Sequence, residues 1–115
     1  MDSRQAIESL AALAQESRLA LYRLLVKRGP AGYAAGDIAD RLGIPSTTLS
    51  FHLKALAQAG LVTARKKSRF LYYSANFSRM NELVSFLTEN CCTLAGGLPD
   101  ASCATVKPAT RRKTA

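Results

Sequence analysis

The chain has 115 residues, which is enough for one domain with a hydrophobic core of its own. Its 48% hydrophobic and 21% charged residues are typical of a globular domain and exclude a disordered chain. No apolar run is long enough to span a membrane, and the N-terminus lacks a signal-peptide pattern. We therefore expect a cytoplasmic protein that does not bind membranes.

The excess of positive charge indicates what kind of molecule the protein binds. The chain has 16 Lys and Arg against 8 Asp and Glu, a formal net charge of +8. No acidic residue lies between Asp40 and Glu82, and the basic residues of that stretch are Arg41, Lys54, Arg65, Lys66, Lys67, Arg69 and Arg79. Such a stretch favours phosphate groups as partners, although a solvated basic surface gives the same pattern.

Hydrophobic periodicity predicts a mainly α-helical fold with one β-hairpin. We expect Ser3, Ser17 and Ser78 to cap helices. The predicted helices cover 3–15, 18–28, 35–42, 46–59 and 78 to about 90, and the strands cover 61–65 and 70–74. The segment between the strands lacks Gly and Asn, which argues against a two-residue primed turn. Two helices joined by a tight turn and followed by a basic hairpin predict a winged helix-turn-helix of five helices plus wing.

The predicted domain covers 1–92 and serves DNA binding and dimerisation, and 93–115 form a flexible tail carrying Cys103. The sequence contains no nucleophile paired with a base, no paired carboxylates and no phosphate-binding loop, so we expect no enzyme.

The helix over 46–59 is the candidate for DNA recognition. Its predicted buried stripe consists of Leu49, Leu53, Leu56 and Ala57, which leaves hydroxyls, an imidazole and a lysine facing outward. These are groups that reach base edges and phosphates in the major groove. Phe51 either packs on the preceding helix or touches a thymine methyl group. The candidate DNA-binding residues of this helix and the wing are Ser46, Thr47, Thr48, Ser50, Phe51, His52, Lys54, Arg65, Lys66, Lys67 and Arg69.

Three stretches resemble the ArsR family of bacterial metal-responsive repressors: ESRLALYRLL (16–25), DIADRLGIPSTTLSFHLKALAQAGLV (37–62) and ARKKSRFLYYS (64–74). The family's recognition helix is similar to S-x-S-T-V-S-x-H-L-K-x-L. The residues that match it here are Thr48, Ser50, His52, Leu53, Lys54 and Leu56. Phe51 stands where the family usually has a basic residue, a departure that can alter operator choice. The resemblance implies a repressor that binds double-stranded operator DNA.

The resemblance also implies a homodimer whose first and last helices pack together, which predicts a palindromic operator. The apolar stripes of these helices have no obvious partner in so small a winged helix. The alternative is that they only cover the core of the monomer. The candidate interface residues are Ile7, Leu10, Met80, Leu83, Val84 and Leu87.

Inducer sites of the family can be tested against this sequence. The arsenic-type C-V-C-x-x-C stretch corresponds to 34–39, which has no cysteine, and the zinc-type site needs histidines, of which His52 is the only one. The cysteines that remain are Cys91, Cys92 and Cys103. They resemble those of a subgroup of arsenite repressors with adjacent cysteines after the last helix and one more in the tail.

Three thiolates without a histidine suit a soft three-coordinate ion, arsenic(III) or antimony(III), better than tetrahedral zinc. Adjacent cysteines can bind one ion only where the helix end unwinds. We expect arsenic(III), or its close analogue antimony(III), as inducer and no organic cofactor. Three alternatives stay open: a redox switch in which Cys103 forms a disulfide with Cys91 or Cys92, an arsenic-binding protein without operator regulation, and incidental cysteines.

Overall fold

A computed structural model of the chain describes residues 1–95. Its elements are α1 Ser3–Leu13, α2 Glu16–Arg28, β1 Tyr33–Ala34, α3 Ala35–Leu42, α4 Ser46–Gln58, β2 Val62–Lys67, β3 Phe70–Ala75, α5 Phe77–Thr88 and the 3-10 helix η1 Thr93–Ala95. This order confirms the predicted winged helix-turn-helix. The boundary at residue 92 stays a prediction, and the tail beyond residue 95, with Cys103, lies outside the described residues.

Three predicted caps are wrong, because the capping side chain lies one or two residues earlier. Asp2 caps α1: its carboxylate accepts from the Gln5 amide at 2.8 Å, and the Gln5 side chain accepts from the Asp2 amide at 3.0 Å. This reciprocal pair is a capping box, and it leaves Ser3 as the first helical residue.

The other two caps are amide side chains. Gln15 caps α2 in place of Ser17, and Asn76 caps α5 in place of Ser78. In each case the side-chain oxygen accepts from the backbone N–H three residues later, at 2.9 Å for Arg18 and 3.2 Å for Arg79. The serines already lie inside the helices, where their backbone is too far along to act as the N-cap.

The sheet contains a strand that periodicity did not predict. β1 pairs antiparallel with β3, so the strand order is β1-β3-β2. Two residues are too few to show an alternating pattern, so only the tertiary pairing reveals this strand. Gly32, at φ 71°, precedes β1, and a Cβ there would lie 2.5 Å from the Tyr73 carbonyl oxygen. Only glycine lets the chain approach β3 so closely.

The wing turns more tightly than expected. Lys67 pairs with Phe70, so only Ser68 and Arg69 form the loop. Ser68 adopts φ 58°, a left-handed conformation that is uncommon for a residue other than glycine. The lack of Gly and Asn therefore did not prevent a two-residue loop with a positive φ, and the expectation against a two-residue primed turn was wrong to rely on it.

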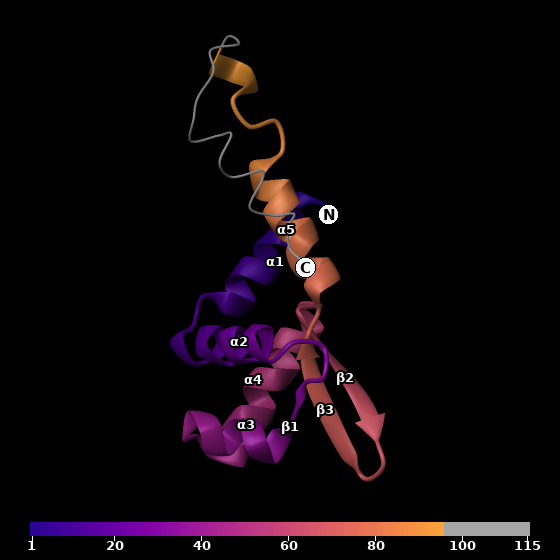
Figure 1. Cartoon of the computed structure of the whole chain (residues 1–115). Helices are drawn as coiled ribbons and strands as arrows, with labels where there is room; N and C mark the ends of the chain where they lie inside the picture. The colour runs from indigo at the N-terminus through magenta and orange to yellow at the C-terminus, as the bar shows by residue number, and fades with distance from the viewer. Residues whose placement is uncertain (96–115) are drawn as a thin grey trace.

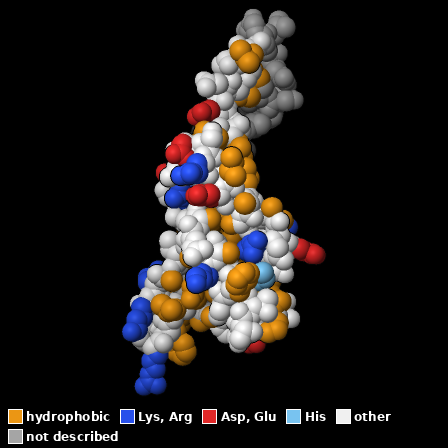
Figure 2. Space-filling model, turned by 180° about the vertical axis from the view of Figure 1, so that it is seen from behind, with side chains coloured by type: hydrophobic (Ala, Val, Ile, Leu, Met, Phe, Trp, Pro, Cys, Tyr) orange, Lys and Arg blue, Asp and Glu red, His pale blue; other side chains and the backbone are white. Residues whose placement is uncertain are grey.

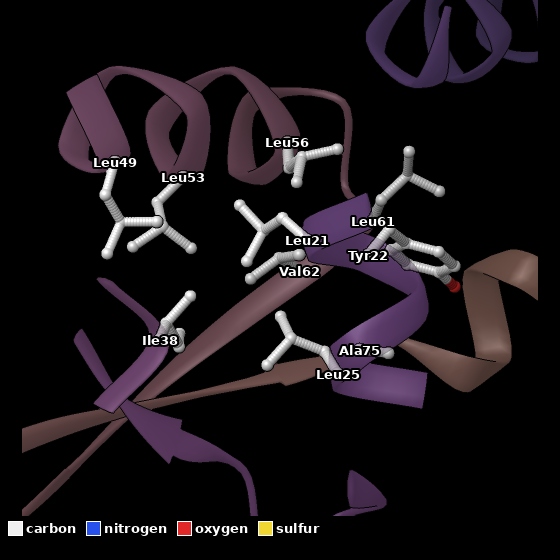
Figure 3. Close-up of a cluster of buried hydrophobic side chains, with 10 residues drawn as sticks. All are labelled: Leu21, Tyr22, Leu25, Ile38, Leu49, Leu53, Leu56, Leu61, Val62 and Ala75. Atoms are coloured by element: carbon white, nitrogen blue, oxygen red, sulfur yellow. The ribbon is translucent and has the colours of Figure 1, made fainter. Parts of the chain in front are cut away.

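The core lies where α2, α3, α4 and the sheet meet (Figure 3). Leu49, Leu53 and Leu56 project from α4 toward Leu21 and Leu25 of α2. Tyr22 of α2, Ile38 of α3, Leu61 just before β2, Val62 of β2 and Ala75 of β3 complete the cluster. The stripe predicted for α4 is confirmed except at Ala57, which is exposed, and His52 is buried on this helix in addition to the leucines.

Two ends of the molecule carry different elements. α1 and α5 pack together at one end, and α3 and the wing hairpin lie at the other, with α2 crossing between them (Figure 1). α5 ends at Thr88, two residues before the predicted end, so the helix stops short of both adjacent cysteines. None of the helices in residues 1–95 is long and apolar enough to cross a membrane.

Candidate nucleic-acid interface

The turn between α3 and α4 is closed by its own backbone. Gly43, at φ 66°, ends α3, and the amides of Gly43 and Ile44 both donate to the Ala39 carbonyl, at 2.8 and 3.2 Å. Pro45 is the N-cap of α4 and provides no side-chain hydrogen bond. The first backbone N–H groups of α4 are thus left for an external acceptor, and a helix N-terminus favours phosphate.

The N-terminal half of α4 presents a polar surface to solvent. The exposed residues are Ser46, Thr47, Thr48, Ser50, Phe51 and Lys54. Their outward orientation is confirmed. Hydroxyl and ammonium groups on one exposed helix face are able to contact both base edges and phosphates.

His52 does not belong to this surface. Its side chain is buried, at 8% exposure, and the predicted outward orientation is wrong. The imidazole lies on the same side of α4 as Leu49 and Leu56, because positions three and four apart share a helix face. Its Nδ1 atom has no hydrogen-bond partner within residues 1–95. In this chain His52 therefore packs inside the domain and is not available on the outward face of α4.

The wing supplies the basic part of the surface. Arg65, Lys66, Lys67 and Arg69 are all exposed, and Figure 2 shows Lys and Arg side chains along the hairpin, with hydrophobic side chains among them. Arg65 also donates from Nη2 to the Ala31 carbonyl at 3.4 Å, which joins the wing to the loop before β1. Within the described residues the single ion pair is Arg79–Glu82, so no wing cation is paired with a carboxylate there.

Two arginines that were not among the candidate DNA-binding residues, one of them in the basic stretch of the sequence, extend the basic surface. The guanidinium groups of Arg28 and Arg41 lie over the Tyr33 ring, 4.8 and 4.6 Å from its centroid. Arg28 Nε also donates to the Gly32 carbonyl at 3.0 Å. Cation–π contacts and carbonyl hydrogen bonds hold these arginines in place without neutralising their charge. Only the missed strand β1 brings them together, so the sequence carried no signal for this cluster.

The predicted dimer face divides into exposed and buried residues. Ile7 and Leu87 are 65% and 56% exposed, and Leu10 is exposed as well. Met80 and Val84 are half-buried. Leu83, at 3% exposure, is already covered by its own chain, so its predicted contact with a second subunit needs correction. Hydrophobic side chains group over the end formed by α1 and α5 (Figure 2).

The adjacent cysteines lie just beyond α5 in an unwound segment. Asn90 and Cys92 have φ values of 60° and 67°, so the helical rise is broken on both sides of Cys91. The two Sγ atoms are 3.3 Å apart, and Cys91 is exposed. Residues 1–95 contain no group of three or more His, Cys, Asp or Glu side chains placed to hold a metal ion. Cys103 lies outside the described residues.

A helix-turn-helix with an exposed polar second helix and a basic wing defines a winged-helix domain of the DNA-binding type. A helix-turn-helix domain family matches residues 13–65. The arsenical resistance operon repressor of Bacillus subtilis is 35% identical over 81 residues, 70% of this chain and 73% of that protein. The chain belongs to the ArsR family of winged-helix transcriptional regulators. This class is regulatory and not enzymatic, as the sequence predicted.

Other relatives fit the same class. The uncharacterised regulator YceK of Bacillus subtilis is 43% identical over 63 residues, which are 55% of this chain and 62% of YceK. The chain also covers 59% of the repressor SdpR, so it spans about three fifths of both proteins. The homodimeric winged helix-turn-helix domain Mb0332 of Mycobacterium bovis has a TM-score of 0.62 and 28% identity, covering 84% of this chain and 88% of that domain.

Proposed function

We propose that the chain is a homodimeric transcriptional repressor that binds a palindromic operator and is released by arsenite or antimonite. The observation that carries the inducer assignment is the unwound segment beyond the end of α5, which places the adjacent Cys91 and Cys92 outside the helix. The exposed face of α4 and the exposed cations of the wing support the DNA-binding part. The similarity to an arsenical resistance operon repressor supports the inducer class.

The number and type of ligands favour a pyramidal ion. Three sulfurs satisfy a three-coordinate ion with a lone pair, whereas zinc prefers four ligands in a tetrahedron. In this proposal Cys91 and Cys92 provide two thiolates and Cys103 provides the third. Each thiol that binds arsenite releases one water molecule from the neutral hydroxide.

Homodimerisation connects the thiols to DNA. α5 packs on α1, and both helices present exposed apolar residues at the end of the molecule far from the wing. A second copy covering these residues would place two α4 helices about one DNA turn apart. Arsenic bound at the end of α5 then changes how the subunits pack and shifts this spacing. Release requires a coupling free energy between arsenic binding and DNA binding. Such coupling is about 1–3 kcal/mol in typical allosteric systems, and it is reciprocal.

The test is a fluorescence-anisotropy titration of the protein–operator complex in reducing buffer. As(III) and Sb(III) should release DNA, whereas Zn(II), Cd(II) and peroxide should not. Cys91→Ser and Cys92→Ser should bind operator with unchanged affinity and ignore arsenite, and Ser85→Ala on α5 is the matched control that still responds. Release by peroxide alone would favour a redox switch. A Cys91→Ser, Cys92→Ser double variant that still leaves DNA on adding arsenite would overturn the inducer site.

A further inference from the structure

We propose that Phe51 is a specificity-determining residue that recognises the C5-methyl group of thymine in the major groove. The inference rests on the proposed operator binding and names what α4 reads there. Phe51 is 67% exposed, so it does not pack on the preceding helix. Thr47, Ser50 and Lys54, at i−4, i−1 and i+3, are exposed polar residues of the same helix. A large apolar ring therefore stands within the polar surface that would face DNA.

The ring is held in this outward position by its neighbours. Leu49 and Leu53, two residues away on either side, are buried and fill the inner face of α4. The buried His52 ring lies 5.9 Å from the Phe51 ring, centroid to centroid, at an interplanar angle of 62°. Such edge-to-face contacts between aromatic rings are favourable. Phe51 thus projects outward from a helix whose inner positions are occupied and is supported at its base by His52.

The chemistry of the major groove leaves one partner for such a side chain. Phenylalanine has no hydrogen-bond donor or acceptor, and the C5-methyl group of thymine is the apolar group on the base edges of that groove. Contact with the methyl group removes both apolar surfaces from water. Phe70 and Leu71, which are exposed apolar residues as well, belong to the wing and do not lie on the recognition helix. We infer that a methyl contact replaces a charged contact at this position.

The experiment changes the methyl group alone. Duplexes are selected from a random pool by the wild-type protein, and each thymine of the selected site is replaced in turn by deoxyuridine. At the thymine that Phe51 contacts, removal of one methyl group should weaken binding about fourfold, from about 0.8 kcal/mol per buried methylene-sized group. Phe51→Ala should bind the thymine and deoxyuridine duplexes equally well at that position.

Two further variants make the result specific. Phe70→Ala removes an exposed phenylalanine of the wing and should keep the wild-type sensitivity to the methyl group. Phe51→Lys introduces a basic residue on α4 and should abolish methyl sensitivity while steepening the salt dependence by about one phosphate contact. Because Phe51 is exposed, both of its substitutions should leave the circular dichroism spectrum unchanged and lower the melting temperature only slightly, through loss of the His52 contact.

The outcomes separate the inference from the function on which it rests. If the wild-type protein selects no DNA sequence, the proposed repressor function fails. If it selects a site but tolerates deoxyuridine at every position, the Phe51 assignment is overturned and operator binding stands. The same holds if Phe51→Ala and Phe51→Lys show the wild-type weakening at the same thymine, because another residue then contacts that methyl group.

Discussion

Three polar atoms of residues 1–95 are buried without a hydrogen-bond partner: Ser9 Oγ, the Tyr22 hydroxyl and His52 Nδ1. They come from α1, α2 and α4, the helices that pack around one side of the core. A buried polar group without a partner costs about 1–3 kcal/mol of folding free energy. Other interactions therefore offset this cost, and substitutions that remove one of these atoms measure how large it is.

Tyr22→Phe tests this cost and its pH dependence. Burial raises the pKa of Tyr22 from 10.0 to about 12, since the phenolate is disfavoured away from water. The folded state then holds its proton where the unfolded state releases it, so stability is lost as pH rises from about 10 to about 12. We expect Tyr22→Phe to be as stable as wild type or more so at pH 7.

Urea unfolding at pH 7 and between pH 10 and 11.5 measures both effects. The free energy of unfolding of the variant should exceed that of the wild type by a margin that widens with pH. Taking this difference cancels the titration of the lysines, which are common to both proteins. A constant difference across this range would show that the Tyr22 hydroxyl is solvated.

At the scale of the elements, two glycines with positive φ act for different reasons. Gly43 ends α3 with open space around its Cα, whereas a Cβ at Gly32 would meet the Tyr73 carbonyl oxygen. Glycine is needed at Gly43 for backbone conformation alone, and at Gly32 for both conformation and strand pairing. The predicted C-terminal break at Gly43 is confirmed, and the constraint at Gly32 depends on the unpredicted strand β1.

Alanine at each glycine separates these contributions. Gly43→Ala should cost about 1–2 kcal/mol, the strain of a left-handed residue with a Cβ. Gly32→Ala should cost clearly more, because β1 must also move away from β3. Denaturant unfolding gives both values, and equal costs would contradict the close approach at Gly32.

The wing and α4 should contribute to DNA binding in different ways. Lys66→Ala and Lys67→Ala should weaken binding to every sequence and lower the salt slope by about one for each phosphate that is no longer neutralised. Thr48→Ala should instead relax the preference for the selected site, because its exposed hydroxyl lies on the recognition helix. Arg23→Ala, an exposed cation of α2, serves as the control. Anisotropy titrations over a range of salt would refute this division if the wing variants changed sequence preference alone.

At the scale of the whole molecule, the apolar surface of α1 and α5 is the candidate interface of the proposed dimer. Ile7 and Leu87 are exposed in the single chain, and α1 already packs on the buried side of α5. Exposed apolar groups gathered on one end of a small domain are typical of an interface with another subunit. The homodimeric domain from Mycobacterium bovis has the same fold, and this supports the proposed dimer.

Substituting glutamate for either of two leucines of α5 distinguishes a residue of the dimer interface from a residue of the core. Leu87→Glu should release folded monomers, because the charge is buried only in the dimer. Leu83→Glu should unfold the chain or destabilise it by several kcal/mol, because the charge is buried within one subunit. Sedimentation and circular dichroism together measure both outcomes. A folded dimer of the Leu87→Glu variant would show that the interface lies elsewhere.

Much of the fold could be predicted from local patterns. The helix over 35–42, the tight turn at Gly43 and the buried leucines of α4 follow from hydrophobic periodicity and from the glycine that ends the helix. The outward hydroxyls of α4 follow from the same periodicity. These features are local because side chains three and four residues apart share one helix face.

Tertiary structure decided the features that depend on contacts between distant residues. Strand β1, the arginines around Tyr33, the burial of His52 and the burial of Leu83 all follow from packing against elements that are remote in sequence. The identity of each helix cap also depends on which side-chain oxygen reaches the first free backbone N–H groups. Several neighbouring polar residues could act as the cap, and their local sequence does not distinguish them. Residue types and periods therefore determined the class of fold and the outward face of α4, whereas the identity of the buried polar groups and of the exposed apolar ones was determined by packing in three dimensions.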